Sequence, residues 1–206
     1  MQNTLFDSID SKECLNFENN NFFENKKLKA LNFDNKIIKD KEFQNCNFVR
    51  CNFLECSFER CSFEECSFYN CNLSLVKLIS SRFITVNFHN SKLVGINWVK
   101  AATPLDVNFF ECIINNSNFL GLGLRNINII KCEAKETNFA DANLKNAKFT
   151  STNLEKSRFL NTNLIQANFT DAINYSINPN QNQLKKTIFT LPEAISLLQN
   201  LDIILK

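Results

Sequence analysis

Large apolar residues recur at every fifth position over most of this chain. We call these positions centres. One series runs from Phe23 to Trp98 without a miss, and a second runs from Phe109 to Phe169 with Ala134 as its one small member. A period of five fits neither a helix nor a strand. The pattern therefore predicts a backbone that turns once every five residues, with a one-residue phase slip near residues 99–107.

The position two residues before each centre is also restricted, because it holds small or apolar residues. The position just before the centre is mostly polar, and often Asn, which tolerates left-handed turns and can bond its own backbone. Two of every five positions thus face inward and three outward. The chain has 34 Asn but only three Gly and three Pro. The many large apolar residues argue against disorder, and the few glycines argue against a doubly wound nucleotide-binding fold.

The repeat resembles the pentapeptide-repeat family, whose motif is roughly A(D/N)LXX. Clear matches are Ala142-Asn143-Leu144, Ala167-Asn168-Phe169 and Cys51-Asn52-Phe53. The resemblance implies an all-β fold, a right-handed quadrilateral β-helix of about 7–8 coils with four pentapeptides per coil, ending in a short C-terminal capping α-helix. We expect residues 1–20 to form an N-terminal cap and residues 21–174 the β-helix. Residues 175–206 would form a connector, a helix and a dimerisation or capping segment.

The phenylalanines and cysteines of the N-terminal half are expected to form a core ladder. Cysteines 20 residues apart, such as Cys46 and Cys66, would stack on successive coils. A disulfide ladder or a metal site is the alternative, but stacked parallel side chains fit a disulfide poorly and the spacing is not that of a zinc site. We interpret these thiols as small core residues. The ladder comprises Phe43, Phe48, Phe53, Phe58, Phe63, Phe68, Cys46, Cys51, Cys56, Cys61, Cys66 and Cys71.

Little in the sequence indicates catalysis. His89 is the only histidine and follows a centre, where a solvated surface residue is expected. Nucleophilic catalysis by a Cys or by a triad would have to use it. Trp98, the last centre before the slip, is expected to plug the core, with an exposed binding aromatic as the alternative. We expect no enzyme, no metal site and no cofactor.

The last residues predict a helix with an apolar face. Thr190 and Glu193 have the spacing of a capping box, and Pro192 would lie in the first turn. This helix would cover the end of the β-helix or join two copies of the chain. The resemblance to quinolone-resistance (Qnr-type) and mycobacterial gyrase-inhibitor members implies a homodimer. Its candidate interface is Leu191, Ile195, Leu198, Leu201, Ile203, Ile204 and Leu205.

The same relatives bind DNA gyrase or topoisomerase IV by imitating DNA with a negative surface, so a type II topoisomerase is the partner that the resemblance implies. Residues 21–98 carry 8 acids and 11 bases, however, and no long loop interrupts the repeat. We therefore expect topoisomerase activity to be weak or absent. A mixed-charge surface is the plainer interpretation of the candidate acidic face, which comprises Glu24, Glu42, Glu64 and Glu65, with Asp34 and Glu55 on an adjoining face.

Two other functional classes remain open. One is a scaffold that binds a different protein through outward apolar residues such as Val49, Leu54, Ile84 and Val94; the other is an enzyme using a Cys or His89. The near-neutral charge argues against direct nucleic-acid binding. No apolar run is long enough to span a membrane, and the first residues do not resemble a signal peptide, so we expect a cytoplasmic protein.

Overall fold

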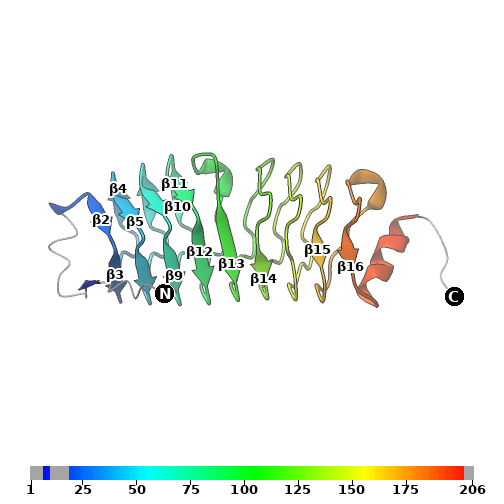
Figure 1. Ribbon diagram of the computed structural model, residues 1–206, viewed down its shortest axis with the longest axis horizontal. Coiled ribbons are helices and arrows are strands. Elements are labelled where there is room, and N and C mark those ends of the chain that lie inside the picture. The colour runs from blue at the N-terminus through cyan, green and yellow to red at the C-terminus, as the bar shows by residue number, and fades with distance from the viewer. Residues whose placement is uncertain (1–6, 10–18, 202–206) are drawn as a thin grey trace.

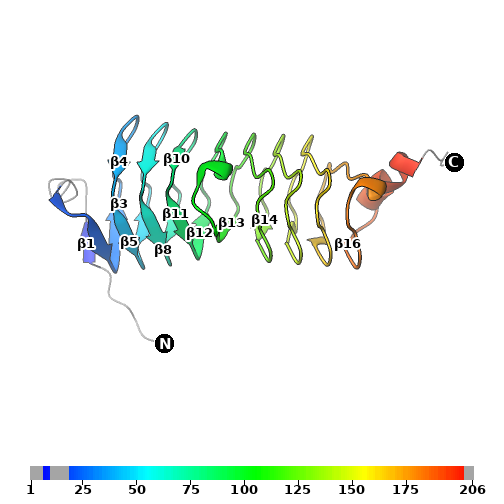
Figure 2. The ribbon, with the colours of Figure 1, turned by 90° about the horizontal axis from the view of Figure 1, so that it is seen from above.

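The computed structural model describes residues 7–9 and 19–201, with side chains from 19 to 198. The chain winds into a rod of about eight stacked coils, a right-handed quadrilateral β-helix (Figure 1, Figure 2). Every strand pairs in parallel with the strand of a neighbouring coil. The strands are β1 (Asp7–Ile9), β2 (Phe22–Glu24), β3 (Lys26–Lys29), β4 (Ile37–Lys39), β5 (Glu42–Gln44), β6 (Asn47–Val49), β7 (Ser57–Glu59), β8 (Ser62–Glu64), β9 (Ser67–Tyr69), β10 (Lys77–Ile79), β11 (Arg82–Ile84), β12 (Val86–His89), β13 (Val107–Phe110), β14 (Ile129–Ile130), β15 (Asn168–Phe169) and β16 (Ile188–Phe189).

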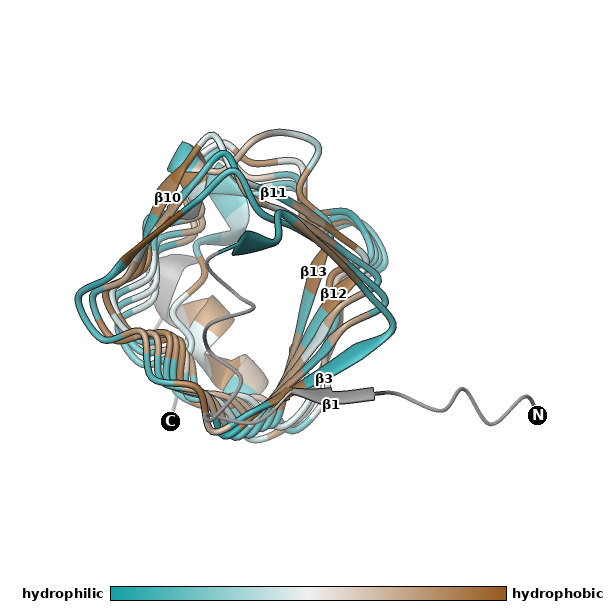
Figure 3. Cartoon of the chain, turned by 90° about the vertical axis from the view of Figure 1, so that its left-hand side faces the viewer, coloured by the Kyte–Doolittle hydropathy of each residue, from teal (hydrophilic) through white to brown (hydrophobic). Residues whose placement is uncertain are grey.

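Each coil has four sides, and equivalent residues on successive coils lie 20 positions apart, as Phe48 and Phe68 do. Figure 3, viewed along the rod, shows the coils superimposed into a four-sided outline. We name the sides in chain order. The β2 face holds β2, β5, β8 and β11; the β3 face holds β1, β3, β6, β9, β12, β13 and β14; and the β4 face holds β4, β7 and β10. The bridge face lies between the β3 and β4 faces and is joined by single β-bridges such as Asn32 to Asn52.

The centres fill the inside of the rod. Phe rings of successive coils stack along its axis, with centroids 4.4 Å apart for Phe48 and Phe68 and 5.0 Å apart for Phe43 and Phe63. Rings on neighbouring sides of a coil meet edge to face, as Phe58 and Phe63 do. Both geometries are favourable for aromatic pairs. Because these side chains are almost fully buried, they occupy the volume that the four faces enclose.

The backbone turns at the position two residues after each centre, where φ lies between +48° and +63° in almost every coil. Asn, which tolerates left-handed turns, fills this turning position only in part. Ten of the left-handed residues in the described part are Asn, but Leu75 and Thr85 also occupy such positions. Many other Asn precede a centre, where Asn52 accepts a bond from Leu54 N and donates to Asn32 of the preceding coil. These side chains form ladders along the outside.

The register changes where the phase slips. Val86 pairs with Val107, an interval of 21 residues, whereas Ala102 N still donates to Ser81 O in the spacing of regular coils. The extra residue therefore lies between Ala102 and Val107. A 3-10 helix, η2 (Trp98–Lys100), precedes it on the β4 face. Leu105 is buried, so the bulge packs back onto the core.

The C-terminal end closes the rod differently from our expectation. The chain forms two further 3-10 helices, η3 (Pro179–Gln181) and η4 (Glu193–Leu201), so the expected α-helix is a 3-10 helix. Thr190 and Glu193 do not cap it as a capping box. Thr190 Oγ1 accepts from Asp171 N (3.0 Å) and Glu193 Oε1 accepts from Asn174 N (2.5 Å). In the preceding coil the corner amide Ser151 N and the centre amide Leu154 N, which correspond to Asp171 and Asn174, donate to carbonyls of the next coil. Here side-chain oxygens take the place of those carbonyls.

Candidate binding surfaces

The candidate acidic residues do not share one side of the rod. Glu24, Glu42 and Glu64 lie exposed on the β2 face, and Glu65 lies at the corner that follows β8. Asp34 and Glu55 follow the bridge face, because Asn32 and Asn52 bridge there and the chain after each turns at Asn35 and Glu55, whose N–H groups donate to Leu54 O and Ser74 O. The β3 and β4 faces separate the bridge face from the β2 face, so the placement of these two residues on an adjoining face is wrong. Because a coil has four sides, a residue two pentapeptides beyond the β2 face lies on the side opposite to it.

Basic side chains interrupt the acidic residues of the N-terminal half. Arg60 forms a two-pronged ion pair with Asp40, at 2.7 and 2.8 Å, and this hydrogen bond lowers the pKa of Asp40. Lys41 turns back into the N-terminal end of the rod, where its Nζ donates to Asn20 O and Asn21 Oδ1. The Arg60–Asp40 pair neutralises one acid, and Lys41 places a positive charge near Glu42. The β2 face therefore carries a few acids but no continuous negative stripe.

The eight described cysteines outside the N-terminal segment are free thiols, and all are buried. Burial raises the pKa of the Cys56 thiol to about 12, and it also raises the pKa of Cys66. Cys66 Sγ donates to Phe43 O of the preceding coil (3.4 Å), so the thiol acts as a weak hydrogen-bond donor within the core. A buried thiol with a raised pKa is a poor nucleophile.

An aromatic row follows the outside of the β3 face. Tyr69, His89 and Phe110 lie on successive coils, with ring centroids 4.8 and 5.0 Å apart. Partial burial lowers the pKa of His89 against the opposing charge of Glu111, which favours the neutral imidazole. The described residues contain no group of three His, Cys, Asp or Glu side chains that could hold a metal ion. His89 thus lies in a stack, and Trp98 is buried in the core beside Phe119.

The outward apolar residues that could serve a scaffold lie on several faces. Val49 is on the β3 face and Ile84 on the β2 face, while Leu54 and Val94 follow centres of the bridge face. All four are half-buried. They form no common patch.

The end of the rod presents a row of exposed apolar side chains. Leu191, Ile195 and Leu198 are 79%, 42% and 37% exposed, whereas Leu197 packs against the core. The helix η4 therefore has one face on the last coil and one face in solvent. The side chain of Leu201 and the residues Ile203, Ile204 and Leu205 lie outside the described part, as does most of the expected cap over residues 1–20.

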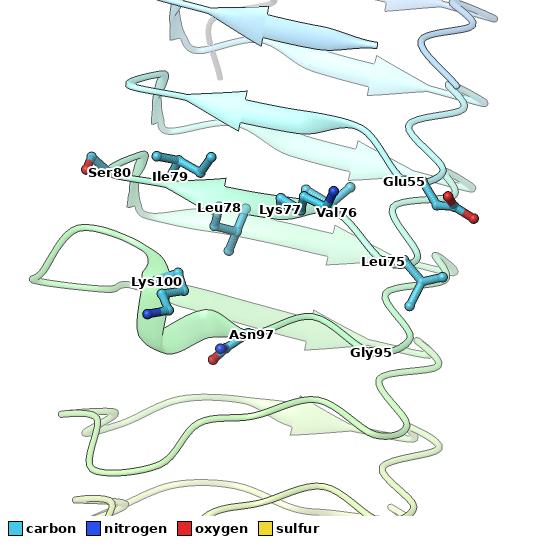
Figure 4. A pocket seen from close by; sticks show the side chains of 10 residues that line it. All are labelled: Glu55, Leu75, Val76, Lys77, Leu78, Ile79, Ser80, Gly95, Asn97 and Lys100. Atoms are coloured by element: carbon cyan, nitrogen blue, oxygen red, sulfur yellow. The ribbon is translucent and has the colours of Figure 1, made fainter. Parts of the chain in front are cut away.

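A hollow on the β4 face has no counterpart among the expected sites. It lies between β10 and η2, has a volume of about 740 Å³ and is lined mainly by apolar groups (Figure 4). Its only signal in the sequence is the phase slip near residues 99–107. The slip indicates one extra residue. It does not indicate that the 3-10 helix η2 replaces the strand expected before the slip.

These features define a class: a parallel β-solenoid of five-residue units whose inside is filled and whose outer faces present the groups that could meet a partner. In the described part, no helix has the length and apolar character to cross a membrane.

Two family models match this chain. A model described as a pentapeptide repeat region matches residues 41–119, and one described as pentapeptide repeats (8 copies) matches residues 123–159 and 137–173. The chain belongs to the pentapeptide-repeat family. A comparison with curated proteins found no match.

Solved structures share the fold at low identity. The chain is similar to a trypsin-treated variant of QnrB1, a plasmid-mediated fluoroquinolone resistance protein, with a TM-score of 0.59, 14% identity, and coverage of 98% of this chain and 100% of that one. HetL, a pentapeptide repeat protein involved in heterocyst differentiation regulation from the cyanobacterium Nostoc sp. strain PCC 7120, matches with a TM-score of 0.43 and 14% identity over 87% of this chain and 92% of that one. At this identity the QnrB1 match supports the fold alone.

Proposed function

We propose that this protein is a non-enzymatic scaffold that acts as a homodimer and binds another protein through its outer faces. The observation that carries the proposal is the shape of the molecule. Core side chains fill the rod, and the exposed apolar row of Leu191, Ile195 and Leu198 stands at one end. Such a row fits a two-fold contact in which two rods meet end to end. That the protein is cytoplasmic remains a prediction.

The dimer is tested by sedimentation of the full chain and of two variants. Leu191→Asp together with Leu198→Asp would place charges in the contact, and we expect this variant to sediment as a monomer. Ile37→Asp is the matched control, because Ile37 is 67% exposed on the β4 face, away from η4. It should remain dimeric. A wild-type chain that is monomeric at micromolar concentration would overturn the dimer.

A type II topoisomerase is the second candidate partner. The QnrB1 fold match over nearly the full length favours it, and Glu24, Glu42 and Glu64 give one side of the rod an acidic group. The ion pairs and the near-neutral charge oppose it, since DNA mimicry needs a negative stripe matched to a basic saddle. We therefore infer that any protection or inhibition of gyrase is weak.

A gyrase supercoiling assay with and without a quinolone tests this second candidate. We expect no rescue and no inhibition at equimolar chain, and at most a weak effect in large excess that Glu42→Lys and Glu64→Lys abolish. Glu111→Lys, in the C-terminal half, is the matched control. Strong rescue at equimolar chain would make a type II topoisomerase the first candidate partner. No effect at any excess of the chain would contradict topoisomerase binding.

A further inference from the structure

The hollow on the β4 face marks a break in the hydrogen-bonded ladder of the rod. On this face Ser57 pairs with Lys77, and Asn97 pairs with Asn118, but Lys77 and Asn97 form no bridge. The break coincides with η2, where the backbone at Trp98–Lys100 becomes helical and can no longer run beside β10. Figure 4 shows the gap that opens between β10 and the chain around Asn97.

The break leaves backbone groups of β10 and its corner without partners in the described part. In the preceding coil Arg60 N donates to Ile79 O (2.8 Å), but the equivalent Ser80 N donates to no described residue. On the bridge face of this coil Leu73 N donates to Lys92 O, whereas the equivalent Leu78 N has no such bond. Both N–H groups belong to the strand edge that borders the hollow. An unpaired strand edge is a template for another extended chain.

The hollow is short, because the coils rejoin on both sides of it. Leu75 N donates to Val94 O (2.8 Å) before β10, and Ala102 N donates to Ser81 O (2.8 Å) after it. The open edge thus runs from Val76 to Ser80. At about 3.3 Å per residue it has room for about three or four residues of an added strand. We call this short opening the bay.

The charges at the bay select the kind of chain that fits. Lys77 and Lys100 line it with exposed side chains, and neither forms an ion pair with another described residue. Glu55 is the single acid there, at the end near Leu75. Leu75 and Ile79, which are 48% and 46% exposed, offer apolar surface. The bay thus offers two cations, two free N–H donors and apolar surface. These groups suit a partner segment that alternates carboxylates with apolar residues.

The second break on the same face differs from the bay. It lies beside η3, and there the corner amide Asn161 N still donates to the next coil, at Gln181 O (2.9 Å), whereas Ser80 N at the bay donates to no described residue. The hollow beside it is smaller, about 370 Å³, and more polar, with Lys156 and Arg158 among its lining residues. Of these two hollows, the bay alone combines a free edge with apolar surface and cations.

We propose that the bay binds a short, extended acidic segment of a partner protein. The segment adds as a strand to β10, its carbonyls accept from Leu78 N and Ser80 N, and its carboxylates pair with Lys77 and Lys100. Backbone bonds supply the mode of binding, and side chains supply the selectivity. The proposal does not depend on the dimer or on topoisomerase binding.

Amide NMR spectra of the full chain test the proposal with a blocked pentapeptide of alternating valine and aspartate as the probe. We expect shifts of the Leu78 and Ser80 amides, and about tenfold weaker binding in Lys77→Glu/Lys100→Glu. Lys148→Glu, an exposed lysine of the β3 face, is the matched control and should bind as the wild type does.

Three further probes separate the parts of the proposal. A valine–lysine peptide should not shift these amides, because it reverses the charge. A backbone N-methylated valine–aspartate peptide should lose binding, because it cannot add as a strand. Sodium acetate should not reproduce the shifts. The proposal is wrong if the valine–aspartate peptide leaves Leu78 and Ser80 unmoved at millimolar concentration, or if any of the three probes shifts them equally.

Discussion

The coils before η2 and the coils after it build the same rod from different side chains. Before η2, the position two residues ahead of the centre is filled by cysteines from Cys46 to Cys71, whereas beyond Cys132 it is filled by Thr, Ser and Ala. Both kinds of side chain reach the centre carbonyl of the preceding coil. Cys66 Sγ lies 3.4 Å from Phe43 O, and Thr152 Oγ1 lies 2.7 Å from Ile129 O.

The comparison shows what this inner position requires. It needs a small side chain, and where that side chain is a thiol or a hydroxyl it also bonds to a buried carbonyl. The hydroxyl is the stronger donor and acceptor. The N-terminal half compensates with aromatic stacking, because its centres are mostly Phe, while many centres after Ile114 are aliphatic, such as Leu144 and Leu154. We therefore expect the N-terminal half to depend more on ring packing and the C-terminal half more on buried hydroxyls.

The largest effect is expected from removing a ring of the N-terminal ladder. Phe63 stacks on Phe43 and Phe83 at 5.0 Å, so Phe63→Ala would leave a cavity in three coils. We expect the free energy of unfolding to fall by about 4 kcal/mol, against about 3 kcal/mol for Leu144→Ala in the C-terminal half. Urea unfolding followed by circular dichroism measures both. Equal losses, or a larger loss at Leu144, would contradict the dependence on rings.

A smaller effect is expected from the inner hydroxyls. Thr152 Oγ1 donates to Ile129 O and accepts from Cys132 N (3.2 Å), so Thr152→Val would leave two buried backbone groups unpaired. We expect a loss of about 2 kcal/mol. The same urea unfolding experiment measures it, and an unchanged stability would contradict the dependence on hydroxyls.

The matching change in the other half is Cys71→Ser. Cys71 Sγ accepts from Cys51 N at 3.4 Å, and Ser91 holds the same position one coil later. A hydroxyl fits that site, so we expect a change below about 0.5 kcal/mol. A large loss in Cys71→Ser, measured by the same unfolding experiment, would show that the thiol is needed for its volume.

Alkaline pH should destabilise the N-terminal half by an amount that is close to zero at neutrality and grows above about pH 8.5. A thiol ionises at about pH 8.5 in the unfolded chain, but burial holds Cys56 protonated up to a pKa of about 12 in the folded one. The contribution of this thiol to stability is fully present below the unfolded pKa and is lost as the pH rises toward 12, by up to about 1.4 kcal/mol per pH unit. The N-terminal half, which holds Cys56, should open first.

Unfolding at pH 7 and pH 10 measures this loss, and Cys56→Ala should reduce the difference between the two. An unchanged difference in Cys56→Ala would show that Cys56 does not contribute to the alkaline loss.

The fold could be predicted from the sequence because a five-residue period is incompatible with both common elements. The centres from Phe23 to Phe169 and the small residues two positions before them place most of the core. Three things could not be predicted. Opposite and adjoining faces were confused for Asp34 and Glu55, because the repeat shows the order of the sides but not their geometry. The bay was missed because the slip near residues 99–107 shows an extra residue, not the loss of pairing beside β10.

Capping was also misjudged, for a physical reason. Thr190 and Glu193 have capping-box spacing, but the N–H groups of Asp171 and Asn174 have no further coil to bond to, and they donate to these two side chains instead. A sequence pattern shows which bonds a side chain can make locally. It does not show that an N–H group from a distant part of the chain competes for the same side-chain oxygen.

Hydrogen exchange at single amides tests most directly the central claim, that a continuous ladder of 20-residue coils breaks on the β4 face beside η2. Arg60 N and Ser80 N occupy the same corner on successive coils, and of the two only Arg60 N donates to the next coil. We predict slow exchange at Arg60 and exchange at Ser80 that is about a hundredfold faster or more. Equal protection of the two amides would contradict the break, and with it the bay.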